Sequence, residues 1–155
     1  MTVSINKPVP DFSGAATSET TFRLSEHRDK HNVVLYFYSK DSTPGCTTEG
    51  QNFRDLHDEF LANDTVIFGI SRDTMRRHEN FKAKQEFPFE LISDESEEIC
   101  NLFDIIKLKK LYGKEYMGIV RSTFLINKQG ILTHEWRNLK VKGHAAEVLE
   151  ACQGI

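Results

Sequence analysis

The residue with the clearest chemical potential is Cys46, which lies in the stretch of residues 39–50, SKDSTPGCTTEG. A strand-like run precedes this stretch and a helix-like run follows it, so the cysteine falls at a strand-to-helix junction. The first N–H groups of a helix have no intrahelical partner and carry the positive end of the helix dipole. That setting lowers the pKa of a thiol and favours the nucleophilic thiolate. The position therefore predicts a reactive cysteine, with a merely buried cysteine as the alternative interpretation.

The residues just before Cys46 predict where the helix begins. Thr43 is a favoured N-cap and Pro44 a favoured first helical residue, which puts Cys46 at the third helical position. At 100° per residue, Cys46 lies ~20° from Phe53 on the helical wheel, so we expect it to face inward. A structural cysteine would fit that angle too, but the Thr-Pro-Gly-Cys setting favours the reactive one.

The other two cysteines carry different expectations. Cys152 ends an i, i+3, i+4, i+7 apolar stripe that begins at Ala145, and we predict that it packs as a small apolar residue. Cys100 lies ~60° beyond Phe103, at the margin of the apolar face of its helix. It is either half exposed and able to form a disulfide or an inert edge residue, and the pattern slightly favours the inert edge residue.

Composition bounds the class of protein. The chain has 155 residues, a net charge of −3, 39% hydrophobic and 28% charged residues, which indicates one soluble domain over residues 1–155. The charge gives no reason to expect nucleic acid or a membrane surface as a partner. No apolar run approaches the ~20 residues that span a bilayer, and the N-terminus lacks the apolar core of a signal peptide. Three cysteines form an odd, sparse set, which favours a reducing, cytoplasmic compartment.

Hydrophobic patterning predicts strands that alternate with helices. Strands are expected at residues 33–38, 65–71, 87–92, 122–126 and 131–136. Helices are expected at about 44–62, 73–85 and 143–152, with another that starts at 93–94 and presents residues 99, 102, 103 and 106 on its apolar face. A weak hairpin ends at residues 20–24, and residues 127–130 predict a second one. This order predicts an α/β fold with a central mixed sheet flanked by helices.

Residues 38–49, YSKDSTPGCTTE, closely resemble the active-site segment of peroxiredoxins. Within them the segment looks most like the bacterioferritin-comigratory-protein, or PrxQ, branch. The match continues in order and spacing at residues 53–55 (FRD), 87–94 (FPFELISD) and 113–126 (GKEYMGIVRSTFLI). The resemblance therefore covers nearly the whole chain. It implies a thioredoxin-like three-layer fold with an N-terminal β-hairpin, and a thiol-dependent peroxidase that serves antioxidant defence.

The resemblance also implies site residues. Cys46 would be the peroxidatic cysteine, Thr43 the hydroxyl that orients peroxide and thiolate, and Arg121 the cation that activates both. The physics agrees, because an arginine stays charged and offers fixed donors to a thiolate and to a departing oxygen. The thiolate would attack the peroxide O–O bond and leave a sulfenic acid, with no metal, flavin or haem cofactor. The alternatives are a surface-paired Arg121, a Thr43 that only caps the helix, and a Glu49 that is a helix-start acid instead of a partner for Arg121.

Two residues depart from the family pattern. Family members usually carry a proline where this chain has Ser39, so the sulfur is either wetter or bonded by the serine hydroxyl. Many members of this branch place a resolving cysteine five residues after the peroxidatic one, where this chain has Gln51. Recycling therefore needs either an external thiol (thioredoxin, glutaredoxin or a low-molecular-weight thiol) or movement of Cys100 towards Cys46. We favour the external thiol.

The remaining signals are weaker. The six histidines form no ligand-like spacing with the cysteines, so no zinc site is expected. A basic cluster at residues 107, 109, 110 and 114 is interpreted as a solvated face, with docking of an acidic reductase as a lesser alternative. We expect a monomer or weak homodimer. The alternative to a peroxidase is a non-catalytic thioredoxin-fold module that senses or relays oxidation.

Overall fold

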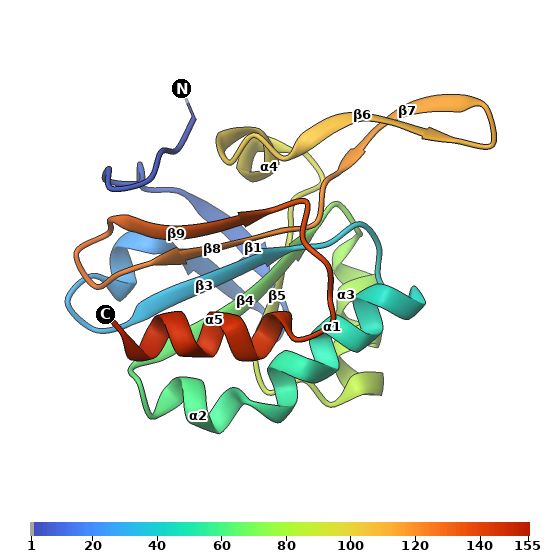
Figure 1. The fold of residues 1–155 in the computed structure, drawn as a ribbon. Helices are drawn as coiled ribbons and strands as arrows, with labels where there is room; N and C mark the ends of the chain where they lie inside the picture. The colour runs from blue at the N-terminus through green and yellow to red at the C-terminus, as the bar shows by residue number, and fades with distance from the viewer. Residues whose placement is uncertain (1) are drawn as a thin grey trace.

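The computed structural model describes residues 2–155 (Figure 1). Seven strands form one sheet in the order β2-β1-β5-β4-β3-β8-β9, and β6 and β7 form a separate two-stranded sheet. The strands are β1 (Ser13–Ala16), β2 (Thr20–Arg23), β3 (Asn32–Phe37), β4 (Thr65–Ser71), β5 (Glu90–Ser93), β6 (Ile106–Leu111), β7 (Lys114–Ile119), β8 (Ser122–Ile126) and β9 (Leu132–Arg137). The helices are α1 (Pro44–Asp55), α2 (His57–Leu61), α3 (Met75–Gln85), α4 (Glu98–Leu102) and α5 (His144–Gln153), with a 3₁₀ turn η1 (Leu24–His27).

The sheet is mixed, as the sequence predicts. β3 pairs in parallel with β4 and β4 in parallel with β5, whereas β8 runs antiparallel to both β3 and β9. All six residues of β3 are buried, because layers cover both faces of the sheet at its centre. A continuous apolar run is therefore the correct sequence signal for this strand.

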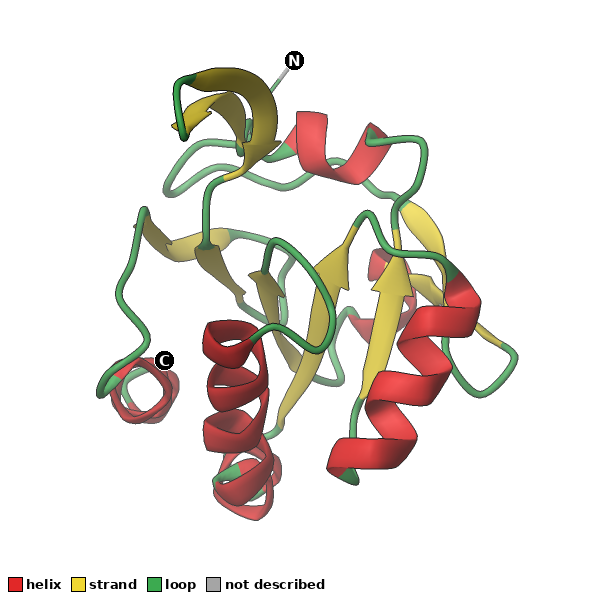
Figure 2. Cartoon of the chain, turned by 90° about the vertical axis from the view of Figure 1, so that its right-hand side faces the viewer, coloured by secondary structure: helices red, strands yellow, loops and turns green. Residues whose placement is uncertain are grey.

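Successive residues of β3 enter two separate cores. Leu35 and Phe37 belong to a cluster that includes side chains from η1, α4 and the N-terminal segment. Tyr36 and Tyr38 belong to a cluster filled by α1, α2, α3 and α5. Because strand side chains alternate between faces, these clusters lie on opposite sides of the sheet. Figure 1 shows α1, α2 and α5 on one side and α4 on the other, and Figure 2 shows the same layers after a 90° turn.

One long helix was expected over residues 44–62, and this expectation is wrong. The chain leaves helical geometry at Leu56, where φ is −102° and ψ is 4°, and α2 starts again at His57. Phe53 of α1 and Phe60 of α2 still belong to the same buried cluster, as their i, i+7 spacing predicts.

Two further boundaries differ from the sequence prediction. The strand expected at 87–92 starts only at Glu90, because the N–H of Phe87 bonds to the carbonyl of Lys82 and ends α3. The helix expected to include Ile106 stops at Leu102, and Ile106 is instead the first residue of β6.

The hairpin of β6 and β7 was not predicted. It extends away from the main sheet in Figure 1. Most of its side chains are exposed, apolar ones as well as lysines. Its exposed apolar residues are Leu108, Leu111, Tyr112, Tyr116 and Met117. Since almost none of the hairpin is buried, its sequence carries no core-facing alternation that would mark two strands. Across residues 2–155, no helix is long and apolar enough to cross a membrane.

Candidate active site

Cys46 lies in the first turn of α1, directly after the loop that follows β3. Thr43 is the N-cap residue with extended backbone geometry, and Pro44 is the first helical residue, as predicted. The Cys46 side chain faces inward and is 1% exposed, in the same buried cluster as Phe53. The expected angle of the cysteine on the helix is therefore confirmed.

Arg121 reaches Cys46 from a distant part of the sequence. It lies between β7 and β8, at the edge of the sheet where β3 ends, because β8 runs antiparallel to β3. Its Nη2 lies 3.2 Å from Cys46 Sγ, and its Nη1 lies 2.5 Å from Glu49 Oε1. The guanidinium thus bridges the sulfur and a carboxylate one turn further along α1. The structure therefore brings Arg121 into contact with Cys46 and with Glu49, the two residues that the sequence analysis proposed as its partners.

The surroundings of the Cys46 thiol favour its ionised form. Burial raises the pKa of this thiol, but nearby donors outweigh burial and lower it overall. In decreasing order these donors are the Thr43 hydroxyl, the Lys40 backbone N–H, the Ser39 hydroxyl and the Arg121 guanidinium. The Ser39 Oγ lies 3.6 Å from Cys46 Sγ, so the serine that replaces the usual family proline does join the network.

Thr43 does not cap α1 with its side chain. Its Oγ1 donates to the carbonyl of Lys40 at 2.8 Å, and it accepts no hydrogen bond from the N–H groups of the first turn of α1. The same hydroxyl acts on the Cys46 thiol. Its single proton can turn from the carbonyl to the sulfur, which suits a group that must orient a second molecule beside the thiolate.

Glu49 is a buried acid with one unpaired oxygen. It is 1% exposed, and burial raises the pKa of its carboxyl to about 7 although Arg121 opposes the shift. Its Oε2 and the hydroxyl of Tyr36 find no hydrogen-bond partner among the described residues. Burial, followed by the charge of Glu49, raises the pKa of Tyr36. The sequence does not distinguish Tyr36 from a core aromatic residue, because it lies within a buried strand.

Neither of the other cysteines lies near this site. Cys100 is fully buried in the cluster on the opposite face of the sheet, so the expectation of a marginal, half-exposed position is wrong. Burial raises its pKa, and a hydrogen bond to the Asp94 carboxylate raises it further. Cys152 is 1% exposed and packs on the buried face of α5, as predicted. All three cysteines are free thiols.

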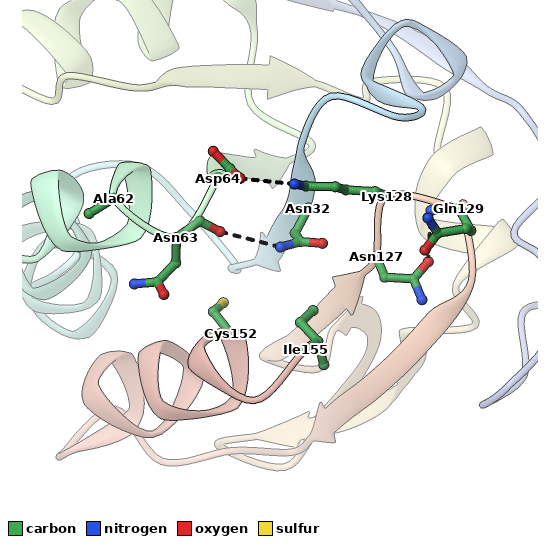
Figure 3. A pocket seen from close by; sticks show the side chains of 9 residues that line it. All are labelled: Asn32, Ala62, Asn63, Asp64, Asn127, Lys128, Gln129, Cys152 and Ile155. Atoms are coloured by element: carbon green, nitrogen blue, oxygen red, sulfur yellow. Dashed lines mark hydrogen bonds and ion pairs between the residues drawn. The ribbon is translucent and has the colours of Figure 1, made fainter.

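Cys152 lines a pocket of about 560 Å³ (Figure 3). Asn32, the first residue of β3, also lines it, so the pocket lies at the opposite end of this strand from the Cys46 loop. Several of its polar groups are already paired: Lys128 bonds to Asp64 at 2.9 Å, and Asn32 donates to the carbonyl of Asn63. The pocket therefore has no part in the chemistry of Cys46.

Sequence reasoning missed a buried polar cluster behind the Cys46 loop. Asp41, Asp73 and His78 are all buried, with ligand atoms within 4.8 Å of one another. The only sequence signal was an aspartate within the cysteine motif. Its partners are too distant in the chain to be read from any local pattern.

The family model that matches this chain is the AhpC/TSA family, over residues 5–135. Peroxiredoxin Bcp of Bacillus subtilis is 49% identical over 155 residues, which is all of this chain and 98% of that protein. Peroxiredoxin Bcp of Xanthomonas campestris is 53% identical over 121 residues, or 78% of this chain and 76% of that protein.

The similar solved structures are also peroxiredoxins of the PrxQ type. Peroxiredoxin Q of Xanthomonas campestris has a TM-score of 0.88 at 47% identity, covering 92% of this chain and 90% of its own. A cysteine-to-serine variant of PrxQ from Xylella fastidiosa has a TM-score of 0.93 at 37% identity, covering 99% and 98%. A further Xanthomonas campestris structure, at 46% identity and a TM-score of 0.87 over 92% of this chain and 90% of its own, concerns alkyl peroxide reduction by the bacterioferritin comigratory protein.

Proposed function

This chain belongs to the AhpC/TSA family and is a peroxiredoxin, a thiol-dependent peroxidase, and we propose that Cys46 is the residue that attacks the peroxide. The observation that carries the proposal is the 3.2 Å contact between Arg121 Nη2 and Cys46 Sγ. A fixed cation beside a buried sulfur stabilises a thiolate that burial alone would suppress. Its second nitrogen is held by Glu49, so its direction does not depend on the sulfur.

In the first step, the Cys46 thiolate attacks one oxygen of the peroxide and the O–O bond breaks. The sulfur gives up two electrons and becomes a sulfenic acid, Cys–S–OH. The other oxygen leaves as an alkoxide or hydroxide and takes a proton to become an alcohol or water. Arg121 stabilises the charge that develops on this oxygen, and the Thr43 hydroxyl orients the peroxide. Hydrogen peroxide and small organic hydroperoxides are the proposed substrates, in keeping with the alkyl peroxide reduction of the Xanthomonas campestris relative.

In the return step, an external thiol attacks the sulfenic sulfur, forming a mixed disulfide and releasing water. A second thiol then attacks the mixed disulfide and frees the Cys46 thiolate. Thioredoxin, glutaredoxin or a low-molecular-weight thiol could each supply both thiols. The buried position of Cys100 across the sheet supports an external reductant over Cys100 as the resolving thiol. A disulfide needs Cα atoms within about 7 Å, and Cys46 and Cys100 lie in separate buried clusters.

We further propose that residues 1–155 act as a single cytoplasmic domain, either as a monomer or as a weak homodimer. Three free, buried cysteines suit a reducing compartment. The net charge of −3 supports neither nucleic acid nor an anionic membrane as a partner.

Intact mass after one equivalent of hydrogen peroxide tests the cycle. We expect a gain of one oxygen in both the wild type and Cys100→Ser, and its loss when a thiol is added. Loss of two hydrogens in the wild type alone would instead make Cys100 the resolving residue. Steady-state consumption of hydrogen peroxide and cumene hydroperoxide, with each of the three reductants in turn, identifies the efficient pair.

A further inference from the structure

The loop that carries Ser39 to Thr43 packs against the segment that follows β4. β3 and β4 are parallel neighbours, so the chain leaves both strands at the same edge of the sheet (Figure 1). Asp41 of the first segment thereby meets Asp73 of the second and His78 of α3, and all three are buried. This cluster is separate from the groups that contact Cys46.

Three bonds hold Asp41 in place. Its Oδ1 accepts a hydrogen bond from the Tyr38 hydroxyl at 2.5 Å, and its Oδ2 lies 2.6 Å from His78 Nδ1. Its backbone N–H donates to Asp73 Oδ2 at 2.9 Å. Asp41 is thus bonded to the end of β3, to α3 and to the segment after β4.

His78 connects this loop to the sheet. Its Nε2 lies 2.9 Å from the carbonyl oxygen of Ile92 in β5, while its Nδ1 faces Asp41. Both ring nitrogens therefore lie within hydrogen-bond distance of an oxygen. His78 and Asp41 form a fully buried, paired network in which each side-chain polar atom has a partner. A self-satisfied network of this kind fixes geometry and needs no metal ion to complete it.

The residues on either side of Asp41 lie beside the sulfur. Ser39 Oγ lies 3.6 Å from Cys46 Sγ, and the Thr43 hydroxyl donates to the Lys40 carbonyl at 2.8 Å. The Thr43 hydroxyl, the Lys40 N–H and the Ser39 hydroxyl all lower the pKa of Cys46. Between them, Ser42 has a φ of +65°, in the left-handed region that a serine rarely adopts. Such a backbone persists only where its surroundings hold it. Asp41, the residue before this position, is itself fixed by three hydrogen bonds.

We propose that Asp41 and His78 are positioning residues for peroxide reduction, fixing the loop so that Ser39 and the Thr43 hydroxyl keep their places beside Cys46. Neither touches the peroxide or the sulfur. The inference rests on the peroxidatic role of Cys46 proposed above and assigns a task to residues beyond the thiolate, threonine and arginine.

Two isosteric substitutions at His78 separate this role from general stability. The amide nitrogen of an asparagine occupies roughly the place of Nδ1, so His78→Asn can keep the bond to Asp41 while losing the one to Ile92. The amide nitrogen of a glutamine reaches the place of Nε2, so His78→Gln can keep the bond to Ile92 while losing the one to Asp41. Both variants are neutral at this position and similar in polarity, and each keeps a single bond.

Two readouts apply to each variant. One is the second-order rate constant for hydrogen peroxide, and the other is the pH dependence of Cys46 alkylation by iodoacetamide, mapped by mass spectrometry. We expect His78→Gln to lower the rate constant about tenfold and to raise the pKa of Cys46 by about one unit, because a unit of pKa corresponds to a tenfold change. His78→Asn should stay within about threefold of the wild type, by the same conversion. Thermal melts establish that both are folded at the assay temperature.

Equal effects of the two substitutions, or a slower His78→Asn, would overturn the proposal. If His78→Gln does not fold, Tyr38→Phe decides, since it removes one bond to Asp41 without changing the shape of the core. A rate constant that falls about threefold in Tyr38→Phe supports the positioning role, because it corresponds to a rise of about half a unit in the pKa of Cys46. An unchanged rate constant in Tyr38→Phe overturns the proposal. Because alkylation needs no turnover, it tests the loop even if the wild type fails to consume peroxide, a failure that would refute only the proposed function.

Discussion

Cys46 and Cys100 are equally buried and have opposite chemistry. Each lies in the first turn of a helix, with 1% and 0% of its surface exposed. Around Cys46 the neighbours are donors, including a guanidinium and a backbone N–H, and they lower its pKa despite the burial. Beside Cys100 lies the carboxylate of Asp94, and burial together with this acceptor raises its pKa. Burial alone therefore does not decide reactivity; the sign of the charge and the hydrogen-bonding groups beside the sulfur do.

The two helix starts show how this difference arises. At α4, Asp94 accepts the N–H groups of Ile99 and Cys100 at 3.1 and 2.7 Å, so the carboxylate takes the donors that a thiolate would need. At α1, no side chain caps the first turn, and Thr43 contacts the Lys40 carbonyl instead. Where a carboxylate accepts the first N–H groups of the helix, as at α4, they are not available to stabilise a thiolate. Where no side chain accepts them, as at α1, the positive end of the helix dipole can act on the sulfur.

The largest expected effect comes from removing each sulfur in turn. Cys46→Ser should lower peroxidase turnover by at least about a thousandfold, because a serine hydroxyl is not ionised and is a weak nucleophile towards peroxide. Cys100→Ser should stay within about twofold of the wild type, since its hydroxyl can still donate to Asp94. Coupled assays with saturating thiol measure both. Retained turnover in Cys46→Ser would refute the site assignment.

Exchanging the arginines that accompany the two cysteines gives the next largest effect. Arg121→Met should lower the second-order rate constant for hydrogen peroxide by about 10²–10³-fold, the usual loss when one electrostatic donor to a transition state is removed. Arg72 is the matched control, since its charge acts on the Cys100 thiol and it bonds to Glu97 at 2.8 Å. Arg72→Met should leave the rate constant within about threefold, a change that a surface substitution can produce. Stopped-flow measurements under single-turnover conditions compare the two, and similar losses would show that Arg121 has no special role.

Neutralising Asp94, the acid beside Cys100, tests how much this carboxylate contributes to the difference between the two cysteines. We expect Cys100 to stay unreactive. Asp94→Asn should lower the pKa of Cys100, because it removes the charge that opposes ionisation. Native-state alkylation should still modify Cys46 and spare Cys100 between pH 6 and pH 9, because burial is the largest cause of the raised pKa of Cys100 and is unchanged in this variant. The loss of an acceptor for α4 should cost about 1–3 kcal/mol of unfolding free energy, measured by urea denaturation. Rapid alkylation of Cys100 in the folded variant would contradict the importance of burial on that face.

The smallest effect should come from the serine at the family's proline position. Ser39→Ala removes a donor 3.6 Å from the sulfur, a distance at which a hydrogen bond to sulfur is weak. We expect the pKa of Cys46 to rise slightly and the rate constant for peroxide to fall by at most about threefold. The pH profile of alkylation provides the measurement. A tenfold loss would mean that the Ser39 hydroxyl contributes as much as a full charge.

Much of the fold could be predicted from local pattern because the buried strands leave no ambiguity. β3 and β4 read as apolar runs at the positions that the structure confirms, and Thr74 caps α3 with a bond to the Arg77 N–H. The predictions that were wrong depend on tertiary contacts. Cys100 appeared marginal on a helix that was assumed to continue to Ile106, whereas the chain turns into β6 and the N-terminal segment bonds to Leu102.

The same distinction applies to the site. Cys46 and Thr43 can be identified from one short stretch of sequence. Arg121 is 75 positions from Cys46 and is found only through the family resemblance. Asp41 and His78 are 37 positions apart, and neither forms a pattern with its own neighbours. Such partnerships come from the parallel pairing of β3 and β4, a contact that no periodicity in the sequence reveals.

The isolation of Cys46 from other thiols of this chain has a kinetic consequence. A sulfenic acid without an internal partner waits for an outside thiol, and during that wait a second peroxide can oxidise it irreversibly to the sulfinic acid. Two pseudo-first-order processes then compete, one proportional to thiol and the other to peroxide. Their ratio sets the fraction of molecules lost in each cycle. In the proposed external-thiol cycle, the lifetime of this protein under oxidative load therefore depends on the thiol-to-peroxide ratio around it as well as on its own two rate constants.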